Sequence, residues 1–234
     1  MVTIKSFKGW RPQKAFVEQV AAPPYDVLSS AEAKVLTENN DKSFLRITKP
    51  EVDFEDGIDT YSNEVYAKGK LNWNAFKESE LFQQEDSEAI YFYRQGINGH
   101  FQTGIVAASS IDDYFNGKIK KHEFTRPKKE NDRIAHMDTL GIHPGPVFLT
   151  YNKHETLDEI VKDFVTNNQP TYDFTADDGV SHTLWVVKDP SILEKVVSIF
   201  KTEIDATYIA DGHHRAAASS KVGLKIRESN GDKE

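Results

Sequence analysis

Cysteine is absent from this chain of 234 residues, and methionine occurs only twice. Without cysteine the protein can form no disulfide, no thiolate metal site and no thiol nucleophile. Long apolar runs are missing too, since none approaches the ~20 residues that a membrane-spanning helix needs. The first residues, "MVTIKSFKGWRP", also lack the apolar stretch of a signal peptide. We therefore expect a cytoplasmic protein with no membrane partner.

Positively charged residues are outnumbered by negatively charged ones, and the formal net charge is −8 at pH 7. Proteins that bind duplex nucleic acid normally present a basic face, so we expect no nucleic-acid partner. The cationic residues are nevertheless concentrated in one segment, "KIKKHEFTRPKKENDR" at 118–133, which holds seven Lys or Arg against three Asp or Glu. A nucleic-acid module that uses this strip stays open as an alternative, and it predicts binding that weakens steeply with salt.

The remaining pattern predicts an α+β fold with a mixed sheet and flanking helices. Two hairpins are expected across Asn98-Gly99 and Asp178-Gly179, because these dipeptides suit tight turns between strands. Further strands are expected at 3–7, 43–48, 146–151 and 206–211, and an extended segment at 20–28. Helices are expected at 60–77, 157–165, 190–200 and 216–226, with another after a capping box at Ser29 and Glu32. We expect residues 1–234 to form one α+β unit.

The stretch "IADGHHRAAAS" at 209–219 places a glycine between an expected strand and an expected helix. The first N–H groups of a helix have no partner within it, and the helix dipole puts partial positive charge there. Gly212 lets the backbone approach a phosphate, and Arg215 offers a planar fork for phosphate oxygens. Asp211, at the end of the strand, is placed to orient Mg²⁺ or a hydroxyl group. The plain alternative is an ordinary turn.

His213 and His214 are more than an ordinary turn requires, and imidazoles can bind phosphate or relay protons near neutral pH. Neighbouring helical side chains point about 100° apart, so this pair is poorly placed to share one metal ion. We therefore expect no metal site on the two histidines.

The basic segment supplies a second group of candidates. A helix that begins at Thr125 puts Pro127 in its first turn, where proline is tolerated. The candidates for chemistry are His122 and Glu123, and those for phosphate binding are Lys121, Arg126, Lys129 and Arg133. The alternative is a solvated helix with pairs of opposite charge four residues apart. A third candidate is "APPYDV", in which Tyr25 and Asp26 could form a wall of the same pocket or simply pack in a turn.

Four blocks in the chain resemble, in the same order, those of the bacterial and archaeal family called domain of unknown function 1015. They are "RP…VAAPPYDV", "SFLRITKPE", "IKKHEFTRPKKENDR" and "YIADGHHRAAAS". Members of that family are typically much longer, so the resemblance implies that this chain is the N-terminal part of a longer protein. The polar ending "RESNGDKE" at 227–234 points the same way. Genes of the family commonly neighbour genes of serine biosynthesis.

The turn from Asp211 to Arg215 also resembles the Gly-x-x-Arg turn of the ParB/sulfiredoxin superfamily, which binds nucleotide phosphates at a helix N-terminus. Sulfiredoxins have cysteine where His213 stands, and partition proteins add DNA-binding helices that are not evident here. The free-serine kinases are the most similar branch. This resemblance implies a ParB/sulfiredoxin-like core and covers these five residues alone.

Together these features predict a nucleotide-dependent phosphotransferase that uses ATP or ADP with Mg²⁺ and acts on a small hydroxyl metabolite such as serine. Gly212 and Arg215 would hold phosphates, the two histidines would stabilise the transferred group, and Asp211 or Glu123 would orient the acceptor hydroxyl or Mg²⁺. The alternative is a nucleotide-binding regulatory or sensor protein without turnover.

Overall fold

The computed structural model describes residues 1–231, which fold into two compact units. Unit 1 comprises residues 1–14, 84–122 and 148–211, and unit 2 comprises residues 15–83, 123–147 and 212 onward. Each unit is therefore assembled from three separate stretches of sequence. The expectation of one α+β unit over residues 1–234 stays a prediction, and the end of the expected polar tail, residues 232–234, lies outside the described residues.

Unit 1 carries the sheets. The four-stranded antiparallel sheet has the strand order β5-β4-β10-β9, and the three-stranded sheet β7-β11-β8 is mixed, because β11 is parallel to β7 and antiparallel to β8. The strands of these sheets are β4 (Ile90–Ile97), β5 (His100–Val106), β7 (Ile119–Lys120), β8 (Phe148–Thr150), β9 (Tyr172–Thr175), β10 (Ser181–Val187) and β11 (Thr207–Asp211). The predicted α+β class with a mixed sheet is thus confirmed.

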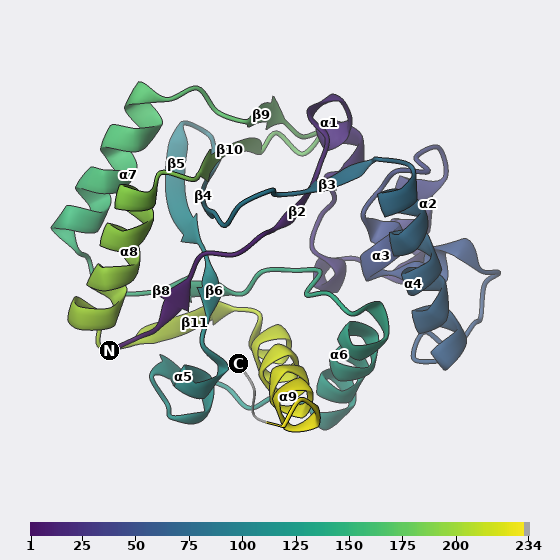
Figure 1. Ribbon diagram of the computed structural model, residues 1–234. Helices are drawn as coiled ribbons and strands as arrows, with labels where there is room; N and C mark the ends of the chain where they lie inside the picture. The colour runs from purple at the N-terminus through teal and green to yellow at the C-terminus, as the bar shows by residue number, and fades with distance from the viewer. Residues whose placement is uncertain (232–234) are drawn as a thin grey trace. The chain divides into compact units, whose positions relative to one another are not determined.

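The remaining elements of unit 1 are short strands and helices of different lengths. The short strands β1 and β6 pair and join its first and middle segments. Two long helices, α7 and α8, lie side by side in its last segment (Figure 1). These elements are β1 (Ile4–Lys5), β2 (Trp10–Pro12), β6 (Ala108–Ser109), α5 (Ile111–Phe115), α7 (Glu155–Asn167) and α8 (Pro190–Glu203). The strand expected at 3–7 is therefore shorter than predicted.

The core of unit 1 lies between the four-stranded sheet and the helices α7 and α8. Phe92 and Trp185 face each other across β4 and β10 and contribute from the sheet. Leu157 contributes from α7 and Phe200 from α8, and all four side chains are at least 95% buried. The alternation of buried and less buried residues along a strand is what leaves one face of the sheet for these helices.

Unit 2 is mainly helical, and several of its helices end or begin where the sequence predicts. Its elements are α1 (Val17–Val20), η2 (Tyr25–Val27), α2 (Ser30–Thr37), α3 (Leu45–Thr48), η3 (Pro50–Asp53), α4 (Asn63–Glu78), α6 (Pro127–Leu140) and α9 (His213–Ser229). The short 3₁₀ helix η1 (Lys14–Phe16) and strand β3 (Phe82–Gln84) lie at the borders between the units. Pro127 is indeed in the first turn of α6, as expected.

One prediction for unit 2 is wrong, and another is confirmed only in part. Residues 43–48 form no strand, because Leu45 packs with Ala33 and Val52 while Ile47 packs with Trp73, and these contacts favour the helix α3 over the β-propensity of the segment. The segment 20–28 is extended only in part, since Tyr25–Val27 forms a 3₁₀ turn in which the Val27 N–H donates to the Pro24 carbonyl.

The predicted capping box at the start of α2 is present. The Ser29 hydroxyl accepts from the Glu32 N–H, and the Glu32 carboxylate accepts from the Ser29 N–H. We expect Ser29→Ala to lower the free energy of unfolding by about 1 kcal/mol, measured by urea denaturation. Ser29→Asp keeps an acceptor at the cap and should lose much less; equal losses in the two variants would contradict this role.

Over residues 1–231 no helix combines the length and the apolar character that a membrane crossing requires.

Candidate functional site

The predicted strand, glycine and helix are present at the quoted motif. Strand β11 ends at Asp211, Gly212 is the N-cap, and α9 begins at His213. Gly212 has φ = +92°, a conformation that costs other L-residues energy. A Cβ at this position would also lie 3.2 Å from Cζ and Nε of Arg215. The backbone conformation therefore favours glycine here, and any larger residue would also require the arginine to shift slightly.

The Arg215 side chain folds back beneath this turn. It is 90% buried, and its Nη1 donates to the Pro146 carbonyl at 2.5 Å. Its Nη2 lies 3.5 Å from Oδ2 of Asp26, a residue 189 positions away in the sequence. The structure thus brings together two of the predicted site residues, Arg215 and Asp26. Both terminal nitrogens of the guanidinium contact groups of unit 2.

His213 and His214 have different partners. The buried His213 ring has Nδ1 3.2 Å from Oε1 of Glu123, whose side chain is 54% exposed. The His214 ring accepts through Nε2 from the backbone N–H of Arg126 at 3.1 Å. An accepting Nε2 places the proton of the neutral His214 ring on Nδ1.

The helices α6 and α9 lie side by side (Figure 1), and the contacts between them indicate that they begin next to each other and run in the same general direction. The contact between His214 and Arg126 joins their first residues, and Met137 packs against Ala218 and Val222 farther along. Lys221 pairs with Glu130, and Lys225 lies 2.5 Å from Asp138. Two positive helix ends are therefore adjacent at one edge of unit 2.

The cationic residues of α6 divide between the protein surface and contacts within unit 2. Arg126 and Lys129 are exposed. The Lys128 ammonium lies 4.7 Å from the ring centroid of Tyr61, and the Arg133 guanidinium lies 4.3 Å from that of Tyr25. The three remaining candidates, Lys121, His122 and Asp211, are exposed residues of unit 1.

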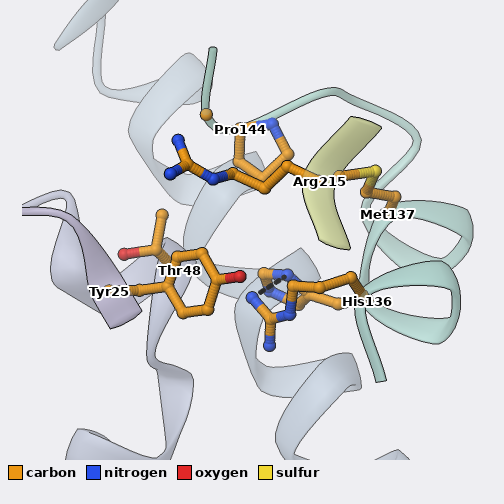
Figure 2. A pocket seen from close by; sticks show the side chains of 8 residues that line it. Tyr25, Thr48, His136, Met137, Pro144 and Arg215 are labelled. Atoms are coloured by element: carbon orange, nitrogen blue, oxygen red, sulfur yellow. Dashed lines mark hydrogen bonds between the residues drawn. The ribbon is translucent and has the colours of Figure 1, made fainter. Parts of the chain in front are cut away.

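A small cavity lies beside Arg215 in unit 2. In Figure 2 the side chains of Arg215 and Pro144 lie on one side of it and those of Tyr25 and His136 on the other. Its walls are Tyr25 and Thr48; Arg133, His136 and Met137 of α6; Pro144 and Gly145; and Arg215 of α9. The space inside it that the centre of a water molecule can occupy is about 20 Å³, so the cavity has room for about one water molecule and not for a whole ligand.

Two titratable groups of this cavity are held in their neutral forms. Burial, together with a smaller effect of the charge of Arg133, lowers the pKa of His136 to about 3. His136 donates through Nε2 to the Ile47 carbonyl at 2.9 Å and turns Nδ1 toward Arg133. Burial likewise raises the pKa of the Tyr25 hydroxyl, against the opposing effect of Arg133. The cationic residues of the lining are Arg133 and Arg215, and each lies beside a carboxylate, because Arg133 pairs with Asp132 at 2.6 Å and Arg215 contacts Asp26 at 3.5 Å.

Sequence reasoning singled out Tyr25, Arg133 and Arg215 but missed the other five lining residues. One signal was available for His136, because it lies three residues after Arg133 and therefore shares a face of the same helix. Thr48 and Gly145 carry no comparable signal, since they reach the cavity only through the packing of separate segments.

The comparisons with known proteins give one result. The family model described as "Protein of unknown function (DUF1015)" matches residues 4–234. No curated protein and no solved structure matches the chain at a significant level.

Proposed function

For this chain, which belongs to the DUF1015 family, we propose a nucleotide-dependent phosphotransferase that acts on a small hydroxyl metabolite such as serine. The observation that carries the proposal is the adjacent start of α6 and α9, joined by His214 and Arg126. Parallel helices with neighbouring positive ends repel each other there, and an anion bound at that edge offsets the repulsion. Phosphate groups of a nucleotide have the required charge.

The side chains around this edge suit the phosphate role. Arg126 and Lys129 are exposed and can approach phosphate oxygens from solvent. Arg215 lies against Gly212 and adds positive charge beneath the turn. His213, held by Glu123, and His214 are near enough to the helix ends to donate to a transferred phosphoryl group.

In the proposed reaction the acceptor hydroxyl oxygen forms a bond to the terminal phosphorus of ATP or ADP. The bond between that phosphorus and its bridging oxygen breaks, the shortened nucleotide leaves, and the hydroxyl proton passes to a base. Glu123 is the proposed base or orienting group, with His122 and Asp211 as the alternatives. The exposed carboxylate of Glu123 is a ligand that suits Mg²⁺, which typically binds one or two carboxylates together with substrate phosphates. Bound Mg²⁺ would supply charge neutralisation.

A ParB/sulfiredoxin-like core is part of the same proposal. It is supported by the local order of strand β11, the left-handed Gly212 and helix α9. If the core is of this type, we expect nucleotide phosphates to bind at this turn.

Thermal unfolding with ATP, ADP, CTP and GTP plus Mg²⁺ tests the phosphate site. A nucleotide at a hundred times its dissociation constant stabilises the folded protein by about 2.7 kcal/mol, which raises the unfolding temperature by roughly 5–10 °C. We expect the double variant Arg126→Ala/Lys129→Ala to lose most of this shift. Lys128→Ala is the matched control, because it removes one positive charge from the same turn but from a side chain that lies over Tyr61.

Two results would separate the alternatives. A nucleotide shift followed by a phosphorylated hydroxyl product in a serine assay supports the phosphotransferase, whereas a shift without product over a panel of hydroxyl metabolites favours a sensor without turnover. An unchanged shift in the double variant would refute phosphate binding at the paired helix ends.

A further inference from the structure

The two edges of the four-stranded sheet in unit 1 differ in how they are protected against other strands. The edge strand β9 is short and carries the exposed Asp173, and Asp177 and Asp178 follow it. Such charges discourage another strand from adding to an edge. The opposite edge strand, β5, has seven residues, none of which is Pro, Asp, Glu, Lys or Arg. Its register with β4 runs without a bulge, so this edge lacks the usual protection.

The backbone of β5 points a row of hydrogen-bonding groups away from the sheet. The two-residue turn Asn98-Gly99 is closed by a residue pair that exchanges both backbone hydrogen bonds. Because bonded and non-bonded pairs alternate along an antiparallel ladder, the N–H and C=O groups of Phe101, Thr103 and Ile105 point away from β4. Within residues 1–231 no backbone partner reaches these groups. They are therefore open to a further strand.

The side chains of these three residues lie on the face of the sheet that carries the core. Ile105 is opposite the completely buried Phe92 and packs against the same core. Since side chains alternate between the two faces of a strand, Phe101 and Thr103 point to the same side as Ile105. Phe101 is nevertheless 61% exposed. A strand added at this edge would therefore cover apolar surface that now contacts water.

A second copy of β5 complements this edge. When two β5 strands run antiparallel about a two-fold axis at Thr103, Phe101 faces the partner's Ile105, and Thr103 faces its own counterpart. Aromatic and β-branched side chains form favourable cross-strand pairs, and no two like charges are opposed. Gly104 leaves open space on the other face, where the partner's Gln102 lies opposite. Pairing β5 with β9 of another copy would instead match seven residues with four and would not close about a two-fold axis.

We propose that two copies of this chain associate through β5, so that their four-stranded sheets join into one continuous antiparallel sheet. The outward groups of Phe101, Thr103 and Ile105 then pair with those of the partner. The contact is independent of the proposed phosphotransferase, because β5 belongs to unit 1 and holds no residue assigned to phosphate binding. An edge contact buries less area than a standard interface of about 1,600 Å², so we expect a dissociation constant of about 10–100 µM.

Sedimentation velocity on the full chain over a concentration series measures this association. The wild type should shift from monomer to dimer as the concentration passes through that range. Thr103→Lys and Thr103→Glu each oppose two like charges at the axis, and we expect each variant to dimerise at least tenfold more weakly. An equal mixture of the two variants opposes unlike charges and should restore a dimer. Thr175→Lys is the matched control, because it makes the same change at an exposed position on β9, and it should dimerise like the wild type.

Amide hydrogen exchange on the wild type gives a second measurement that needs no substitution. The N–H groups of Phe101, Thr103 and Ile105 should exchange more slowly as the protein concentration rises. Those of Gln102 and Gly104 point toward β4 and should show no such dependence. The two sets of N–H groups alternate along one strand, so each serves as the control for the other.

The inference is overturned if the wild type stays monomeric throughout the series, or if the mixture stays as monomeric as its two components. It is also overturned if Thr175→Lys weakens the dimer as much as Thr103→Lys does, or if the exchange of the outward N–H groups does not depend on concentration. Circular dichroism checks that each variant is folded. If the charged variants do not fold, hydrogen exchange on the wild type still decides the outcome.

Discussion

Replacing Phe92 with alanine is expected to lower the free energy of unfolding by about 4 kcal/mol. Phe92 is completely buried, faces Trp185 across the central strand pair and meets the Phe164 ring edge-on at 5.4 Å. Truncation removes apolar contacts and leaves a cavity between the sheet and α7 that the two rigid layers cannot close. Chemical denaturation monitored by circular dichroism measures the loss.

Phe101→Ala on β5 is the matched control for this prediction. Its ring is 61% exposed, so the same change in side-chain size should cost less than about 1 kcal/mol. Similar losses in the two variants would mean that the sheet of unit 1 is not packed around Phe92 as described.

The second large effect is a loss of stability in mild acid that depends on His136. In an unfolded chain this imidazole takes up a proton near pH 6.5, whereas in the folded protein its pKa of about 3 keeps it neutral. Between these values the unfolded state binds more protons, so the stability is greatest above pH 6.5 and falls as the pH decreases. The contribution of His136 is about 1.4 kcal/mol per pH unit, or about 2 kcal/mol between pH 6.5 and 5.

Urea denaturation at pH 7.5 and 5.5 on the wild type and His136→Gln measures this contribution. Glutamine can still donate to the Ile47 carbonyl but takes up no proton, so its stability should fall less over this range. His182 in unit 1 also has a pKa lowered by burial, so part of the slope remains in the variant. Met137→Leu, a buried neighbour that does not titrate, should keep the wild-type slope; an identical slope in all three proteins would show that His136 is not buried in the folded state.

Local signals in the sequence account for most of the secondary structure. Asn98-Gly99 forms the predicted hairpin turn, with φ = +51° and +78° at its two residues. Asp189 caps α8, and Ser29 caps α2, because their side-chain oxygens reach the first N–H groups of the helix. These features depend on residues within three or four positions of one another, which is why they can be predicted from the chain alone.

The prediction at 43–48 failed for the opposite reason. Phe44, Leu45 and Ile47 have the composition of a strand, yet the segment is helical because its partners in unit 2 come from distant positions. No pattern within six residues contains that information. A short apolar segment therefore adopts the structure that buries it best.

By itself, the sequence determined the α+β class, the strand, glycine and helix around Gly212, and the place of Pro127 in the first turn of α6. Only the tertiary structure decided that Asp26 lies beside Arg215, that α6 and α9 begin together, and that His136 is buried next to Arg133. The physical reason is the range of the interactions. Turns and caps are set by hydrogen bonds between near neighbours, whereas a cavity lined by segments up to 190 residues apart exists only after those segments have packed.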